Sequence, residues 1–268
     1  MAPRRLAVMT AIVVLATGCG AAGRSAPPAS SPAATTPRPT ILSQVPTLAP
    51  TAAASTSPSA SGSIDPTDFV ATVDNPWFPL IPGTVFTNTG MKDGKRAVDT
   101  FEVGHETMVI AGVTCVVIHD SLKLDGVLEE RTSDYYGQDR AGNVWYFGED
   151  TDELDAKGNV TTTEGSWHAG VDGAMPGIYM SADPAVGQSF AQEFYEGHAE
   201  DHFRVKALAV HVKVPFGSYA DALLTEEWTP LEPDVLDNKY YVRGIGQVRE
   251  VAVKGDPEEL SLARIQRP

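Results

Sequence analysis

Short runs of alternating apolar and polar residues dominate the chain from about residue 83 onward, and Gly, Pro, Asp or Asn interrupts them. Alternation with a period of two places every second side chain on one face of an extended segment, so it predicts half-buried β-strands. The expected strands span residues 83–89, 97–103, 107–110, 113–120, 126–136, 143–147, 160–163, 188–194, 203–214, 220–228, 239–242 and 247–253.

Tight turns are expected between several of these strands, at 111–112 and 123–126, because both contain glycine between two apolar runs. Helical periodicity is scarce. One short helix is expected to end at Arg264, with Asp256 as its N-cap and a proline in its first position, and another within 65–73. The pattern predicts an all-β fold with minor α content, an antiparallel meander curled into a barrel, half-barrel or sandwich.

Residues 164–180 match neither period, because they are rich in glycine and carry large side chains at irregular spacing. Long loops in compact domains are usually functional when they are ordered, so we expect a ligand to bind here. Packing in the core is the default interpretation of the aromatic residues here, whereas rings that flank a cavity would suit an apolar molecule or a sugar. The expected ligand-binding residues are Trp145, Trp167, His168, Asp172, Met175 and Tyr179.

The N-terminus has the parts of an export signal: a pair of arginines, an uncharged apolar run over 6–15, and small residues before Cys19. That run is too short to cross a hydrocarbon core of about 30 Å as a helix. Residues 15–19, Leu-Ala-Thr-Gly-Cys, resemble the lipobox of bacterial lipoproteins. The resemblance implies cleavage before Cys19 and its acylation by fatty acids such as palmitate, and two acyl chains anchor a protein stably to a membrane.

Residues 19–62 are mostly Ala, Pro, Ser and Thr, a composition that cannot bury enough apolar surface to fold. We therefore expect a signal peptide over 1–18, a disordered linker over 19–62 and a single domain over 63–268. All 35 acidic residues lie in that domain, whereas four of the 20 basic residues precede it, so the domain carries a net charge of −19. A body of that charge repels phosphates, which argues against nucleic acid as a partner.

Four stretches of the expected domain resemble an uncharacterised family of secreted bacterial β-rich proteins. They are 75–84 (NPWFPLIPGT), 139–147 with its GNVWYF, 170–174 (GVDGA) and 239–248 (KYYVRGIGQV). The resemblance covers most of the domain and implies a β protein of the cell envelope. It transfers no catalytic residue.

A cluster of histidines and acids at 196–202 is the sharpest chemical candidate, because His198, Glu200 and His202 project to one side of an extended chain. Nitrogen and carboxylate groups in that arrangement suit a divalent metal. However, Ala199 stands where the zincin pattern has glutamate, and a solvated, charged loop is the competing interpretation.

Two functions follow. The first is a non-enzymatic lipoprotein without a cofactor, held by its N-terminal lipid at the outer face of the cell membrane. Its β domain would bind a small apolar ligand, a glycan or another envelope protein. The alternative is a metal- or carboxylate-dependent hydrolase of the envelope, built around His198, His202 and the 167–179 loop. A large apolar cavity would favour binding, whereas convergent histidines and carboxylates in a polar cleft would favour catalysis.

Overall fold

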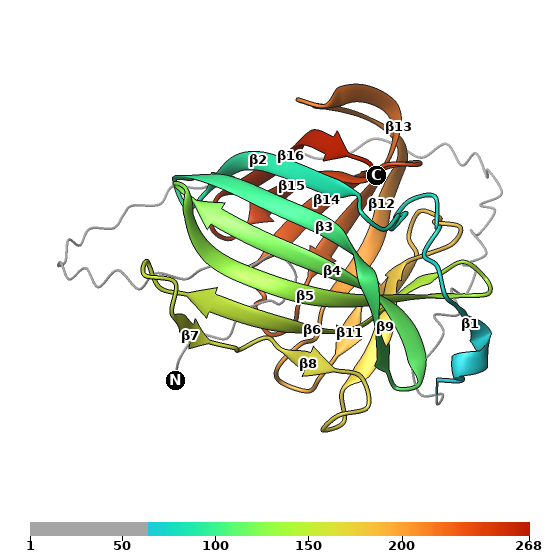
Figure 1. The fold of residues 1–268 in the computed structure, drawn as a ribbon. Helices are drawn as coiled ribbons and strands as arrows, with labels where there is room; N and C mark the ends of the chain where they lie inside the picture. The colour runs from blue at the N-terminus through green and yellow to red at the C-terminus, as the bar shows by residue number, and fades with distance from the viewer. Residues whose placement is uncertain (1–63) are drawn as a thin grey trace, which may run out of the picture. The chain divides into compact units, whose positions relative to one another are not determined.

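The computed structural model describes residues 64–268, so the expected signal peptide, Cys19 and most of the expected linker lie outside the described residues. Within them, a strongly curved antiparallel sheet of 16 strands accounts for most of the chain (Figure 1). The helical content of residues 64–268 is one 3-10 turn, η1 (Pro66–Asp68). This turn is all that forms of the helix expected within 65–73. No helix in this part of the chain is long and apolar enough to cross a membrane.

The front wall of the sheet in Figure 1 is an antiparallel meander that runs from β2 to β6. Its strands are β2 (Val85–Lys92), β3 (Lys95–Ile110), β4 (Val113–Leu124), β5 (Val127–Asp139) and β6 (Val144–Leu154). Three short strands extend this wall: β1 (Phe69–Val70) pairs with β5, and β7 (Val160–Thr162) and β8 (Trp167–His168) pair with β6.

The rear wall is a second meander, and its last strand pairs with β2 and so joins the two walls. Its strands are β12 (His202–Val214), β13 (Gly217–Trp228), β14 (Leu236–Val242), β15 (Gly246–Lys254) and β16 (Glu258–Gln266). Three more strands bring the free edges together: β9 (Met175–Met180) pairs with β6, β11 (Glu193–Phe194) pairs with β9, and β10 (Ser189–Ala191) pairs with β12.

The two ends of the sheet meet at one residue, because Gln192 alone separates β10 at one edge from β11 at the other. We call this junction the seam. The backbone of β9 passes so close to it that a Cβ on Gly177 would lie 2.2 Å from the Ala191 carbonyl oxygen. Only glycine permits that approach. The sheet therefore curls almost into a closed barrel, which confirms the expected all-β, antiparallel fold class.

The expected turns at 111–112 and 123–126 are confirmed. Ala111 and Gly112 have φ angles of 48° and 82°, and Asp125 and Gly126 have 50° and 86°. Positive φ at both central residues is the type I′ geometry, whose twist matches that of the strands it connects.

Three expectations are wrong in detail. The helix expected to end at Arg264 is the strand β16, because the gap between β15 and β2 supplies backbone partners that override the local Asp-Pro signal. The strands expected at 97–103 and 107–110 are one strand, β3, with an irregularity between Val103 and Thr107. The irregular loop expected over 164–180 contains β8 and β9, joined across a turn at Asp172 and Gly173.

The barrel interior holds two hydrophobic clusters with polar residues between them. The larger includes Phe78, Tyr146 and Tyr241, and the smaller consists of Ala97, Leu122, Leu124 and Leu260. Along β3 the inward positions run from Ala97 of the small cluster, through Asp99, to Val103 of the large one. The interior is therefore divided by a layer of charged side chains.

Candidate functional site

A set of buried charged residues, here called the polar layer, is the most unusual feature of the described chain. Strand alternation brings its members inward from both walls, since directly paired residues share a face, as Asp134 of β5 and Glu149 of β6 do. All of them are less than 9 % exposed. The polar layer consists of Asp99, Asp134, Glu149, Glu193, Asp201, Glu227, Lys239 and Glu250.

Lys239 on β14 is the cation of this layer. Its ammonium lies 2.7 Å from Glu227 Oε2 and 3.9 Å from Glu250 Oε1. Tyr241 donates to the other oxygen of Glu227 at 3.3 Å, and Gln247 donates to Glu250 at 3.0 Å. The two carboxyl groups raise the pKa of Lys239 well above its usual value despite its burial, so the ammonium stays charged.

The carboxyl groups that the front wall contributes to the polar layer accept hydrogen bonds from neutral side chains. Tyr146 donates to Asp134 at 2.6 Å, Asn88 donates to Asp99 at 2.9 Å, and Thr151 donates to Glu149 at 3.1 Å. Burial raises the pKa of Asp134 to about 7, and the hydrogen bond from Tyr146 opposes that rise only in part. Burial also raises the pKa of Glu149 well above its usual value. These groups therefore favour the protonated form at moderately acidic pH.

The seam carries polar groups that have no hydrogen-bond partner. Glu193 is 0 % exposed and Gln192 is 1 % exposed; neither Gln192 amide atom is paired, and the Glu193 carboxyl group is hydrogen-bonded to the Trp167 indole. Glu149 Oε1 is unpaired as well. Burial raises the pKa of Glu193 well above its usual value, and the charges of Asp201 and Glu149 raise it further. Buried polar groups in folded proteins nearly always have partners, so this group is exceptional.

A small open cavity of about 40 Å³ lies on the aromatic side of the polar layer. Phe78 and Tyr179 form one part of its wall, with ring centroids 4.7 Å apart, and Phe86 and Phe101 form another, with centroids 5.9 Å apart. Asn88 and Gln247 also line it, and these are the amides that donate to Asp99 and Glu250. The cavity therefore connects an aromatic wall to the charged interior.

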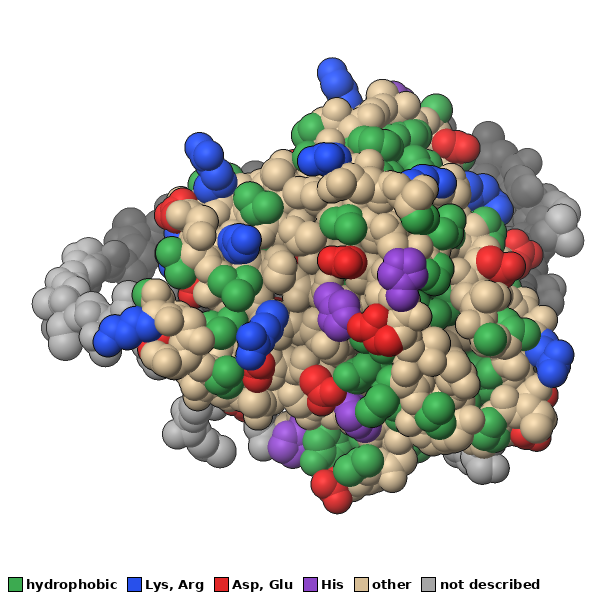
Figure 2. Space-filling view, viewed as in Figure 1, with side chains coloured by type: hydrophobic (Ala, Val, Ile, Leu, Met, Phe, Trp, Pro, Cys, Tyr) green, Lys and Arg blue, Asp and Glu red, His purple; other side chains and the backbone are tan. Residues whose placement is uncertain are grey.

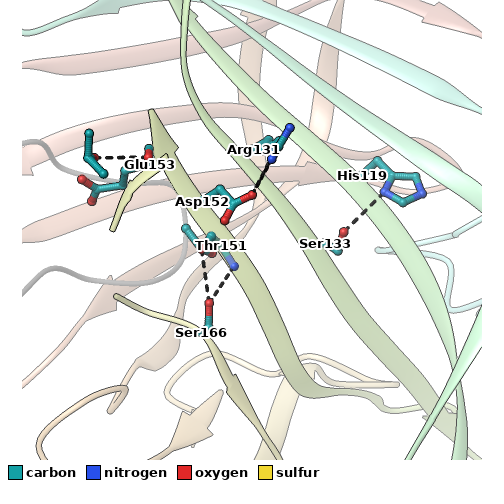
Figure 3. Close-up of polar contacts among 8 residues, drawn as sticks. His119, Arg131, Ser133, Thr151, Asp152, Glu153 and Ser166 are labelled. Carbon is teal, nitrogen blue, oxygen red and sulfur yellow. Dashed lines mark hydrogen bonds and ion pairs between the residues drawn. The ribbon is translucent and has the colours of Figure 1, made fainter. Parts of the chain in front are cut away.

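The outer face of the front wall carries a different set of polar groups. Figure 2 shows histidines and carboxylates gathered on this face. His119 Nε2 lies 2.5 Å from Glu106 Oε1. Its Nδ1 lies 3.5 Å from Ser133 Oγ, a contact drawn in Figure 3. The order Ser133–His119–Glu106 is that of a serine hydrolase triad.

This outer constellation lacks the rest of a hydrolytic site. The side chains of His119 and Glu106 are 49 % and 56 % exposed, so water screens their interaction. Ser133 and His119 are directly paired residues of neighbouring strands, whose amides are used in the sheet and do not form an oxyanion hole. The serine contact is also at the limit of a hydrogen bond. We interpret it as a surface cross-strand contact.

The expected ligand-binding residues separate onto two faces. Trp167 and Tyr179 point inward, and Tyr146 lies between them at centroid distances of 5.5 Å and 6.0 Å. Trp145 packs on Phe69 and donates to Asp139, and His168 packs on Tyr135. Asp172 is exposed at the turn between β8 and β9, and Met175 begins β9. The structure brings only Trp167 and Tyr179 to the interior aromatic row.

The expected metal ligands are engaged in other contacts. The His198 ring stacks on Tyr195 at 4.3 Å, and the His202 ring stacks on Trp228 at 5.6 Å. The carboxylate of Glu200 accepts from the Gly197 amide at 2.6 Å. Within residues 64–268, no group of three or more His, Cys, Asp or Glu side chains is arranged to hold a metal ion. The metal prediction therefore gains no support from this geometry.

Sequence reasoning missed the polar layer, although a signal was present. Asp134 alternates with Tyr136, and Lys239 with Tyr241, so each charged residue shares its strand face with a large aromatic residue. A strand face that mixes charged and aromatic residues is the pattern that could have pointed to a polar interior. The thiol of Cys115 is buried, and burial raises its pKa to about 12. Such a thiol is inert as a nucleophile.

Two solved structures resemble this fold. One is described as an exported protein with a YmcC-like fold from Bacteroides fragilis, with 16% identity, a TM-score of 0.41, and coverage of 71% of this chain and 99% of that chain. The other is described as a lipoprotein from Parabacteroides distasonis, with 13% identity, a TM-score of 0.38, and coverage of 72% and 99%. Likeness at this level says nothing about function. No family model and no curated protein matches the sequence.

Proposed function

We propose that the chain is an exported lipoprotein, anchored at the outer face of the cell membrane through Cys19, whose barrel binds a small polar or amphiphilic molecule. The lipobox at residues 15–19 supports the anchor. The composition of the barrel interior supports the binding role, and it favours such a molecule over a purely apolar one.

The observation that carries the proposal is the group of unpaired buried atoms at the seam, on Gln192 and Glu149, beside the buried carboxyl group of Glu193. Each unpaired buried polar group costs about 1–3 kcal/mol of folding free energy. A barrel with a purely structural role would be more stable with apolar residues at these positions. A bound molecule that pairs with these atoms would remove the penalty, because it replaces the water that they lose on folding.

The hydrolase alternative has less support. The exposed Ser133–His119–Glu106 contact has no oxyanion hole, and the predicted metal ligands do not converge. The interior carboxyl groups are shielded from water, which a hydrolase must admit to its reacting centre.

The binding proposal is tested by native mass spectrometry of the full-length protein, released from its own envelope with a mild detergent. We expect wild-type protein to carry an additional small-molecule mass, and Glu193→Leu to lack it. Glu106→Leu is the matched control, because it makes the same change on the outer face, and it should retain the mass. A wild-type protein without bound mass, or equal occupancy in both variants, would refute the proposal.

The anchor has its own test. Cys19→Ser should release folded protein from membranes into the soluble fraction, because the acylated side chain is lost. If the variant still sediments with membranes and resists extraction with carbonate, the lipobox interpretation is wrong.

A further inference from the structure

The aromatic cavity has a wall that suits a positive charge. Four of its lining residues are Phe78, Phe86, Phe101 and Tyr179. The faces of aromatic rings carry partial negative charge and attract ammonium groups within about 6 Å. The Phe78 ring also lies 6.0 Å from that of Phe101, so the two aromatic pairs are continuous.

Buried carboxyl groups stand behind this wall. Asn88 donates to Asp99 at 2.9 Å, and Gln247 donates to Glu250 at 3.0 Å. Two buried ammonium groups act on these carboxyl groups: Lys239 lies 3.9 Å from Glu250 and is shared with Glu227, and the charge of Lys92 acts on Asp99. Burial nevertheless raises the pKa of both Asp99 and Glu250 above the usual range. A cation placed in the cavity would favour their ionised form, which burial otherwise disfavours.

The size of the cavity limits what can enter. About 40 Å³ of free volume corresponds to roughly three water positions, whereas an engineered cavity that binds benzene in another protein measures about 150 Å³. An ammonium head group with one or two carbon atoms fits this space. A sugar ring or an aromatic ring does not, unless the lining residues move.

We infer that this cavity receives the ammonium head group of a small organic cation, with the rest of that molecule extending toward solvent. The inference rests on the proposed binding function and adds to it the chemical class of the ligand. The aromatic rings supply the cation–π contacts, and Asp99 and Glu250 supply the opposite charge behind them.

The test uses full-length protein in detergent and titrates ethylammonium chloride, with ethanol as the neutral molecule of equal heavy-atom count and sodium chloride to match ionic strength. We expect saturable binding of ethylammonium by calorimetry, together with a higher Tm, and neither effect from ethanol. Phe101→Leu should weaken ethylammonium binding about 3- to 30-fold, as expected for the loss of one cation–π contact.

Asp99→Asn is the second variant, because it keeps the shape of the side chain and removes its charge, and it should also weaken binding. Glu106→Gln is the control, since it removes one carboxylate from the outer face, and it should bind as wild type does. Equal binding of ethanol and ethylammonium would overturn the cationic class while leaving the binding function intact. No binding of either probe would overturn the inference as well. If the envelope-derived protein then also carries no bound mass, the binding function fails with it.

Discussion

The inner and outer faces of β4, β5 and β6 both carry charged residues, but the two faces stabilise those residues in different ways. Outside, charges meet in exposed pairs, such as Arg131 with Asp152 at 2.7 Å. Inside, Asp134 and Glu149 have hydroxyl partners, and burial raises the pKa of both. Because water screens the outer pairs, they contribute little to the free energy of folding, whereas the inner groups change that free energy through their burial.

The largest difference between the faces should appear when a cation is removed. Lys239→Met leaves Glu227 and Glu250 buried without their counter-charge, and we expect a loss of about 3–5 kcal/mol in the free energy of unfolding. Arg131→Met on the outer face is the matched variant, and it should change stability by less than about 1 kcal/mol. Urea denaturation measures both. Similar losses would show that the two faces do not differ as described.

The second difference is in how the stability of the fold depends on pH. Burial raises the pKa of Asp134 and of Asp201 from 3.8 to about 7, so the folded state binds more protons than the unfolded state between pH 4 and 7. Stability is therefore highest below about pH 4 as far as these groups are concerned, and it falls as the pH rises toward 7 and above.

Thermal unfolding from pH 4 to pH 8 measures this effect, which should amount to about 4 kcal/mol for each of the two groups. Asp134→Asn should make Tm fall less steeply with pH, whereas Asp152→Asn on the outer face should leave the pH dependence of Tm unchanged. A Tm that rises with pH over this range would contradict the assignment of Asp134 and Asp201 as buried acids.

A smaller effect is expected at the seam. Gln192→Leu replaces an unpaired buried amide by an apolar side chain of similar size, and it should stabilise ligand-free protein by about 1–3 kcal/mol. Chemical denaturation of protein stripped of bound molecules checks this. A destabilised variant would mean that Gln192 has a partner in solution and that the seam is a structural contact.

The smallest effect is predicted on the outer face. Ser133→Ala removes a contact of 3.5 Å to an exposed histidine, and it should change stability by less than about 0.5 kcal/mol. Esterase activity toward a generic ester should be the same in wild type and variant. Esterase activity that is lost in Ser133→Ala would support the hydrolase alternative and would place the functional site on the outer face.

The sequence predicted most strands and several turns, since both depend on neighbours in the chain. The alternation around Phe203–Val214 and the Ala111–Gly112 turn are examples. It failed where partners came from far away. Residues 258–266 became a strand because β15 and β2 lie on either side, and 175–180 became a strand because β6 and β11 do.

For the site, the sequence indicated Trp167 and Tyr179 but not the polar layer around them. Alternation determines which residues share a face, so Asp134 and Tyr136 had to point the same way. It does not determine which face becomes the interior or which strands stand opposite. Strand pairing set Lys239 of β14 between Glu227 of β13 and Glu250 of β15. Curling of the sheet made this face the interior and brought the two edges together at Gln192. The sequence therefore determines which side chains share a strand face, but whether a charged side chain is buried depends on how the whole sheet closes.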